Sequence, residues 1–497
     1  MTPTGQRPAP KLSVRRSLAF SFAQRYTNLL MSVPTIIIVS RLLTPAQVGV
    51  FSLGMAVTGL IHSLRDFGVS DYLVQVRDVN DGVAQTAFTI NVIIAWTLGV
   101  LVFLSAGYVA DFYSEPGLAD LLKIFCLNFL LLPFGTTTYA LLKRSMQFNL
   151  IYKINVLQQM TQSVLTVALA YLGFGYLGLG IASAASIVVL AVASVTIGRE
   201  YRIKGISLTN WREVASFGSQ RTTTDIVSRV AASTPDFVLA RVMDFTAVGL
   251  FSRGKGLVNM FDQNILTAIK SVTFPSYAGD FRDKRNAGQS YLLSKEFTSV
   301  ISLPFLGFAI ILAYPIMRAM FGPQWDAAVP IMQVLAFAAM IGSVNSDGPE
   351  FLIAAGRVGL VTRITLFVQL LRIPLVIAAA FYSLVAVASV QLLVTVTSLL
   401  LVQTSVMRNS SVSVASLLRA LSKSAVVTLC SLIGPVVLAV FGPFDEDAVW
   451  MPLVVASSAA LLGWLIGIVI TGHPVRGEIA NALSTVGRRL YAGRSAP

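Results

Sequence analysis

The sequence contains few of the residues that build catalytic and metal centres in soluble enzymes. Of its 497 residues, two are cysteine and two are histidine, and both cysteines, Cys126 and Cys430, lie inside apolar segments. Two cysteines allow neither a disulfide framework nor a cysteine-based metal site. Two distant histidines exclude an H-E-x-x-H zinc motif, and the sequence has no P-loop. We therefore expect no enzymatic activity, no cofactor and no resident metal.

Charge is also scarce. Only 12% of the residues are charged and 55% are hydrophobic, whereas about a quarter of the residues of soluble domains are charged. Apolar runs recur along the chain, each close to the ~20 residues that a helix needs to cross a bilayer. The sequence predicts an all-α integral membrane protein with about fourteen transmembrane helices, at residues 17–40, 47–75, 84–109, 117–142, 149–173, 176–199, 215–240, 246–275, 290–314, 325–353, 357–380, 383–406, 418–441 and 449–472.

Acidic residues are the scarcer of the two signs, 23 against 37 basic residues, for a net charge of +14. The basic residues gather in alternate loops, and the acidic run from Asp445 to Asp447 lies in one of the other loops. Because cytoplasmic loops are rich in Lys and Arg, both termini are predicted to be cytoplasmic. Basic residues at cytoplasmic helix ends also lie near anionic lipid head groups, which accounts for the excess positive charge. We therefore expect no nucleic-acid partner.

One stretch occurs twice. "RLLTPAQVGVFS" (Arg41 to Ser52) returns as "RVMDFTAVGLFS" (Arg241 to Ser252), 200 residues later. Six predicted helices separate the copies, which indicates parallel repeats with a substrate site between them. We expect a basic tail at 1–16, an N-lobe at 17–200, a linker at 201–214, a C-lobe at 215–407, two further helices at 408–473 and a basic tail at 474–497.

Within the repeated stretch, two residues of each copy stand out. Gly49 and Gly249 permit close approach of helices, and Arg41 and Arg241 are predicted at the outer mouth of the helices. Two interpretations stay open for these arginines, a structural packing signature and a direct substrate contact.

The stretch from Arg41 to Gln75 resembles the start of the bacterial polysaccharide transporters, the O-antigen and exopolysaccharide flippase family of the multidrug, oligosaccharidyl-lipid and polysaccharide exporter superfamily. The likeness continues through "LLKRSMQF" (Leu141 to Phe148) and "GFGYLGLG" (Gly173 to Gly180). It implies two six-helix lobes plus two C-terminal helices. It also implies a flippase that moves polyprenyl-pyrophosphate-linked oligosaccharide to the periplasmic leaflet by alternating access. Implied partners are that glycan lipid, a polysaccharide polymerase and other glycan-assembly proteins.

Three other functions remain open. A lipid II flippase of peptidoglycan synthesis needs a similar cationic cavity. A cation-coupled multidrug antiporter of the same superfamily would instead use carboxylates. A non-transporting scaffold for glycan-synthesis enzymes would not require charge inside the helices of both lobes.

Ionisable residues inside the predicted helices are the candidates for a functional site, because each costs about 2.5 to 3.5 kcal/mol to insert. They cluster in the first two helices of each predicted lobe, which indicates a water-filled cavity with an excess of positive charge. Guanidinium groups offer forked donors that match a phosphate. We predict that the substrate head group is bound by Arg25, Arg65, Arg221, Arg229 and Arg253.

A second set of residues could couple transport to H⁺ or Na⁺ or balance the charge. It contains His62, Asp225, Asp262, Asp347 and Glu350. His62 and Asp262 occupy equivalent positions of the repeat and form either a proton-sensing pair or a polar contact between helices. Asp347 and Glu350 flank Gly348 and Pro349, which predict a helix break, and belong either to a plain loop or to a cation site.

Arg221, Asp225 and Arg229 recur every four residues and therefore share one helix face. They form either an ion-pair ladder between helices or a cationic face for phosphate.

Overall fold

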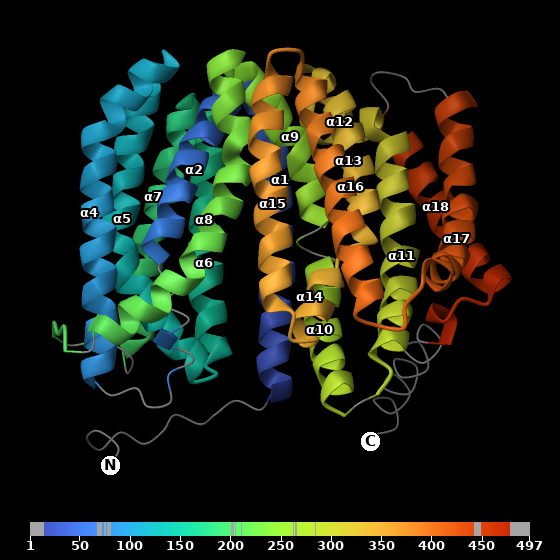
Figure 1. The fold of residues 1–497 in the computed structure, drawn as a ribbon. Helices are drawn as coiled ribbons and strands as arrows, with labels where there is room; N and C mark the ends of the chain where they lie inside the picture. The colour runs from blue at the N-terminus through green and yellow to red at the C-terminus, as the bar shows by residue number, and fades with distance from the viewer. Residues whose placement is uncertain are drawn as a thin grey trace, which may run out of the picture. The chain divides into compact units, whose positions relative to one another are not determined.

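The computed structural model describes residues 14–66, 72–73, 76, 81–199, 203, 205–209, 211–261, 263, 266–283, 285–441 and 449–477. Every regular element in these ranges is a helix (Figure 1). Helices satisfy all backbone hydrogen bonds within one segment, which a bilayer core without water demands. The predicted all-α fold is confirmed for these residues.

By internal contacts the chain forms two units, Met1–Gly249 (unit 1) and Leu250–Pro497 (unit 2). The helices of unit 1, labelled as in Figure 1, are α1 (Val14–Leu42), α2 (Pro45–Asp66), α4 (Asp81–Tyr113), α5 (Pro116–Arg144), α6 (Phe148–Tyr171), α7 (Gly175–Ile197) and α8 (Trp211–Val242). The lobes expected from the repeat, with a linker at 201–214, stay a prediction.

Small residues set the packing of unit 1. Helix α4 lies along α5, as Figure 1 shows, and α5 and α6 both pack against α7. Ala95 and Ala106 of α4 are fully buried, and a Cβ added to Gly99 would lie 3.1 Å from the Cβ of Phe129 in α5. Close contact between small residues is the main attraction available to helices in lipid, where apolar area alone favours no partner.

Helix α9 (Phe245–Phe261) begins in unit 1 and continues into unit 2. The other helices of unit 2 are α10 (Thr267–Arg282), α11 (Ala287–Ile311), α12 (Ala313–Phe321), the 3₁₀ helix η3 (Pro323–Ala328), α13 (Val329–Ser343), α14 (Gly348–Ala354), α15 (Val358–Ala380), α16 (Leu384–Arg408), α17 (Val414–Phe441) and α18 (Trp450–Thr471).

Helix α11 is the central element of unit 2, because it packs against α10, α13 and α17. Its first turn is capped by Asn286, whose side chain accepts from the backbone N–H of Gln289. Helix α18 packs on α17 (Figure 1) and is also joined to α11, since the indole N–H of Trp464 donates to the carbonyl of Val300 at 2.8 Å.

Most predicted helices match observed ones within a few residues, and four differ. The segment 47–75 is observed as α2 only to Asp66, after which the chain is described in part. The segment expected as one helix at 246–275 is divided into α9, which ends at Phe261, and α10, which begins at Thr267 and extends past Pro275 to Arg282; between them Gln263 and Leu266 are π-helical. The segment 290–314 ends at Ile311, and a separate α12 follows. The segment 325–353 is interrupted between α13 and α14.

Ten helical segments of the described chain are long and apolar enough to cross a membrane. The chain is therefore a multi-pass membrane protein. The total of fourteen helices and their arrangement as two parallel lobes plus two helices stay predictions.

Candidate functional site

The repeated stretch forms a helix crossing within unit 1. Gly49 of α2 lies so near the start of α9 that a Cβ on it would be 3.1 Å from the backbone nitrogen of Gly249. Arg41 and Arg241, at the ends of α1 and α8, are both exposed. The guanidinium of Arg241 lies 5.2 Å from the ring centroid of Phe112 in α4. The glycines thus lie in a backbone contact, and Arg241 packs over an aromatic ring.

Three of the arginines predicted to bind the head group lie in unit 1 and have side chains that the structure describes. Arg65, in the last turn of α2, is 5% exposed, Arg25 of α1 is half-buried, and Arg229 of α8 is exposed. His62 lies one turn before Arg65 and stacks on the ring of Phe129 in α5, with 4.6 Å between the centroids. Because positions three apart share a helix face, α2 presents a buried guanidinium beside a stacked imidazole.

Three predicted residues cannot be placed. Arg221 and Asp225 belong to helix α8, but their side chains lie outside the described part of the structure, and Asp262 lies outside it altogether. The predicted ladder on α8 and the predicted pairing of His62 with Asp262 therefore stay predictions.

Arg253, in α9, is held by aromatic rings in unit 2. Its guanidinium carbon lies 5.8 Å from the ring centroid of Phe321 and 5.6 Å from that of Trp325. Both rings are at most 2% exposed. Gly254 brings α9 close to α13, since a Cβ there would lie 3.2 Å from Cγ2 of Ile331. The arginine is therefore fixed by packing at the junction of α9 with α12 and η3.

The charge of Arg253 is not neutralised by a carboxylate of the described residues, and its buried Nε has no hydrogen-bond partner among them. Aromatic faces attract a cation through their quadrupole, but they leave its net charge in place. The guanidinium therefore remains available to an anion.

The helix break predicted at Gly348 and Pro349 is confirmed, because α13 ends at Ser343 and α14 begins at Gly348. The four residues between them form turns. Glu350 lies half-buried in the first turn of α14.

Asp347, in this break, is completely buried and saturated with donors. Its Oδ2 accepts from the hydroxyl of Tyr277 at 2.5 Å and from that of Ser294 at 2.5 Å. Its Oδ1 forms an ion pair with the ammonium of Lys295 and accepts from Ser346 at 3.3 Å. Asp347 is therefore neither a plain loop residue nor an unfilled cation site, because a lysine of the same unit supplies the positive charge.

Lys295 was not among the residues predicted from sequence. It lies in α11, is 1% exposed, and its ammonium is 4.5 Å from the ring centroid of Tyr291. The apolar run predicts a membrane helix at 290–314, and a single lysine inside the run does not alter that prediction. The cost of burying an unpaired charge was the signal that could have identified it.

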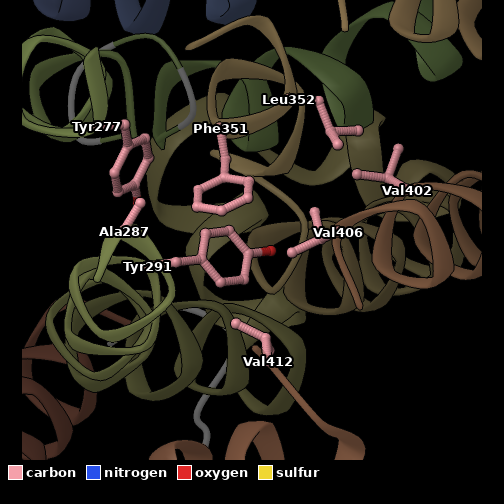
Figure 2. Packing of buried hydrophobic residues seen from close by; sticks show 8 residues of the cluster. All are labelled: Tyr277, Ala287, Tyr291, Phe351, Leu352, Val402, Val406 and Val412. Atoms are coloured by element: carbon pink, nitrogen blue, oxygen red, sulfur yellow. The ribbon is translucent and has the colours of Figure 1, made fainter. Parts of the chain in front are cut away.

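Aromatic side chains enclose this ion pair. The rings of Tyr277, Tyr291 and Phe351 pack together with centroids 5.0 to 6.2 Å apart (Figure 2). Figure 2 also shows the hydroxyl oxygen of Tyr291 on the side away from Tyr277. That hydroxyl accepts from Nε2 of Gln403 in α16 at 2.8 Å. The network thus ties α11 to α10, α14 and α16.

The two charged features of unit 2 differ in what they offer a ligand. A buried pair such as Lys295 and Asp347 has no net charge, and breaking it leaves an uncompensated buried ion. It can hold helices in place or change with their arrangement. Arg253 keeps its charge, so it is the better candidate for binding an anion.

A third polar contact joins the residues after α18 to α17 and α11. Nδ1 of His473 accepts from the backbone N–H of Val475 at 3.3 Å, and Nε2 lies 3.2 Å from Oγ of Ser424. The Ser299 hydroxyl donates to Ser424 at 2.8 Å. Burial, and secondly the charge of Lys423, lower the pKa of His473 from its ordinary value. A neutral ring suits the acceptor role of Nδ1.

No group of three or more His, Cys, Asp or Glu side chains suited to a metal ion occurs among the residues that the structure describes.

Comparison of the sequence with known families and proteins gives consistent matches. The family described as "Polysaccharide biosynthesis protein" matches residues 38–330. The succinoglycan biosynthesis transport protein ExoT of Rhizobium meliloti (strain 1021) is 25% identical over 338 residues, 68% of this chain and 68% of that protein. The lipopolysaccharide biosynthesis protein WzxC of Escherichia coli (strain K12) is 22% identical over 346 residues, 68% of this chain and 70% of that protein.

Solved structures share the fold. A structure titled "Lipid II flippase MurJ, inward closed conformation" superposes with a TM-score of 0.74 at 13% identity, over 91% of this chain and 99% of that chain. A multidrug resistance transporter of the MATE family, in the MOP superfamily, gives a TM-score of 0.63 at 18% identity, over 77% of this chain and 95% of that chain.

Proposed function

The chain belongs to the family of polysaccharide biosynthesis proteins, and on that premise we propose that it is a flippase for polyprenyl-pyrophosphate-linked oligosaccharide repeat units. It would translocate them across the bacterial inner membrane for surface or exopolysaccharide synthesis, by alternating access. Relatives named as transport and biosynthesis proteins for succinoglycan and lipopolysaccharide support this substrate class.

The observation that carries the proposal is Arg253, a guanidinium packed against Phe321 and Trp325 with its charge uncompensated among the described residues. A pyrophosphate that joins a prenyl chain to a sugar carries two negative charges, and a guanidinium contacts it through parallel N–H donors. The aromatic platform restricts the rotamers of the arginine, so that less side-chain entropy is lost on binding.

The remaining predicted residues keep the roles that the sequence suggests. Arg25, Arg65, Arg221 and Arg229 would hold the head group, and Asp225 or Asp262 would limit its affinity so that release remains fast. The prenyl tail would stay in lipid. The termini would be cytoplasmic, and the partners would include a polysaccharide polymerase. The ion that couples transport, H⁺ or Na⁺, is left open.

The test uses cells that lack this protein and a non-permeant sugar-oxidising reagent that reports the sidedness of lipid-linked oligosaccharide. The deletion is expected to trap the intermediate on the cytoplasmic face and to abolish polymer. Arg253→Ala should lower flipping about ten- to hundred-fold, the effect of losing a charged hydrogen bond of about 1.5 to 3 kcal/mol. Arg282→Ala, at an exposed position, is the matched control.

Each alternative has its own outcome in this experiment. Trapped lipid II would identify a peptidoglycan flippase. Normal intermediates together with new sensitivity to cationic drugs would identify an antiporter. Wild-type flipping in correctly inserted Arg253→Ala would remove this residue from the mechanism.

A further inference from the structure

Arg372 is a cation in the middle of a membrane helix with no acidic residue near it in sequence. It lies in α15, eight residues from the C-terminal end of that helix, or about 12 Å at a rise of 1.5 Å per residue. From residue 351 to residue 444 the chain contains neither Asp nor Glu. The cationic side chain is half-buried. A charge at this depth is costly and by default indicates function.

The contacts of Arg372 satisfy only part of its donor capacity. Its Nη2 donates to Oε1 of Gln391 in α16, and Nε2 of Gln391 donates in turn to Oγ1 of Thr395 at 3.2 Å. A guanidinium has five N–H donors, and an amide oxygen carries no countercharge. The three side chains form a polar row between α15 and α16.

A second polar group of α15 lacks a partner. Oε1 of Gln369, three residues before Arg372 and so on the same helix face, is buried without a hydrogen bond among the described residues. A buried acceptor without a donor is unfavourable by about 1 to 3 kcal/mol. An amide oxygen accepts from any N–H or O–H group, a sugar hydroxyl among them, so the row combines an acceptor open to a hydroxyl with unused guanidinium donors open to an anion.

We propose that Gln369, Arg372, Gln391 and Thr395 form a binding site for a hydroxylated anion, a sugar that carries a phosphate or a carboxylate. Arg372 takes the anion, the oxygen of Gln369 accepts from a sugar hydroxyl, and Gln391 and Thr395 position the guanidinium. This site rests on the proposed function and refines it, because the site would bind the sugar part of the substrate while other residues bind the pyrophosphate.

Binding is measured on the purified full chain in phosphatidylcholine nanodiscs by thermal shift. The probes are glucose 1-phosphate, glucose and inorganic phosphate. The wild-type protein should be stabilised by glucose 1-phosphate at a lower concentration than by glucose or by inorganic phosphate. Arg372→Gln should raise the half-saturating concentration of glucose 1-phosphate roughly tenfold. Gln369→Leu should keep the response to phosphate and lose the gain from the sugar.

Two controls make the outcome decisive. Arg363→Gln changes an exposed arginine of the same helix and should respond as wild type. Arg372→Lys keeps the positive charge but loses the paired N–H donors of the guanidinium. If Arg372→Gln unfolds, Arg372→Lys should still show part of the wild-type response to glucose 1-phosphate. An equal response in wild type and in folded Arg372→Gln would overturn the proposal. Loss of the wild-type response in phosphatidylglycerol nanodiscs would assign Arg372 to lipid head groups instead.

The same variants separate this inference from the proposed function in cells. If deleting the protein leaves lipid-linked oligosaccharide and polymer unchanged, the proposed function fails. If deletion traps the intermediate and Arg372→Gln transports it as wild type does, only the sugar site fails.

Discussion

Gly49 and Gly249 each face the backbone of the other's helix. A Cβ on Gly49 would lie 1.8 Å from the carbonyl oxygen of Phe245, and a Cβ on Gly249 would lie 1.9 Å from that of Pro45. Positions 45 and 49 are separated from 245 and 249 by the same 200 residues as the two copies of the repeated stretch. The contact is therefore reciprocal, and it joins α2 to the start of α9 within unit 1.

We expect Gly49→Ala and Gly249→Ala each to destabilise the protein by about 1 to 3 kcal/mol, because the backbones must separate to admit a methyl group. The double variant should cost less than the sum, since one displacement relieves both contacts. Thermal unfolding in detergent measures this. Gly59→Ala, in the same helix with open space around it, should be neutral or slightly stabilising. Equal melting temperatures for all variants would contradict the close approach.

The ion pair of Lys295 with Asp347 leads to a coupling prediction. Lys295→Met or Asp347→Leu alone should cost about 3 to 5 kcal/mol, because each leaves an unpaired buried charge, and the double variant should recover a large part of the loss. A double-mutant cycle on unfolding free energies provides the measurement. Strictly additive losses would show that the two groups do not interact.

Tyr277→Phe removes one donor from Asp347 and leaves the aromatic packing in place. The expected loss is about 1.5 to 3 kcal/mol, the range for a hydrogen bond to a charged group. Tyr382→Phe, at an exposed position in the turn after α15, is the control and should be neutral. If both variants have the wild-type melting temperature, the hydrogen bond from the Tyr277 hydroxyl to Asp347 does not contribute to stability.

His473 predicts a pH dependence. Because its pKa in the folded protein lies below the ordinary value of about 6.5, the unfolded chain binds the proton first as pH falls. This contribution to stability is complete above about pH 6.5 and is lost as pH falls through the lowered pKa. The difference in melting temperature between pH 7.5 and pH 6.0 should shrink in His473→Asn.

The chain's second histidine provides the comparison for this measurement. His62→Asn, which changes a residue of α2 in unit 1, is the comparison variant. A response that disappears with His62 instead would assign the titration to α2.

Local sequence signals predicted the bounds of the helices well where an apolar run begins and ends clearly. The bounds of α5, α6, α7 and α15 lie within a few residues of the predicted segments. The single helix expected at 246–275 is divided into α9 and α10, because apolar periodicity does not show where the α-helical hydrogen-bond pattern is interrupted. The break at Gly348 was predicted, since a glycine followed by a proline disfavours continuation of a helix.

The sequence by itself determined that this chain lies in a membrane and which segments are helical. It also showed a repeated stretch and charges inside apolar segments. These features follow from residue type and from spacing along the chain. Only the tertiary structure decided which charges are already paired. Asp347 and Lys295 are 52 residues apart and neutralise each other, whereas Arg253 and Arg372 find only aromatic or amide partners among the described residues. Ionic contacts act over a few ångströms in space, so the role of a buried charge depends on neighbours that the sequence places far away.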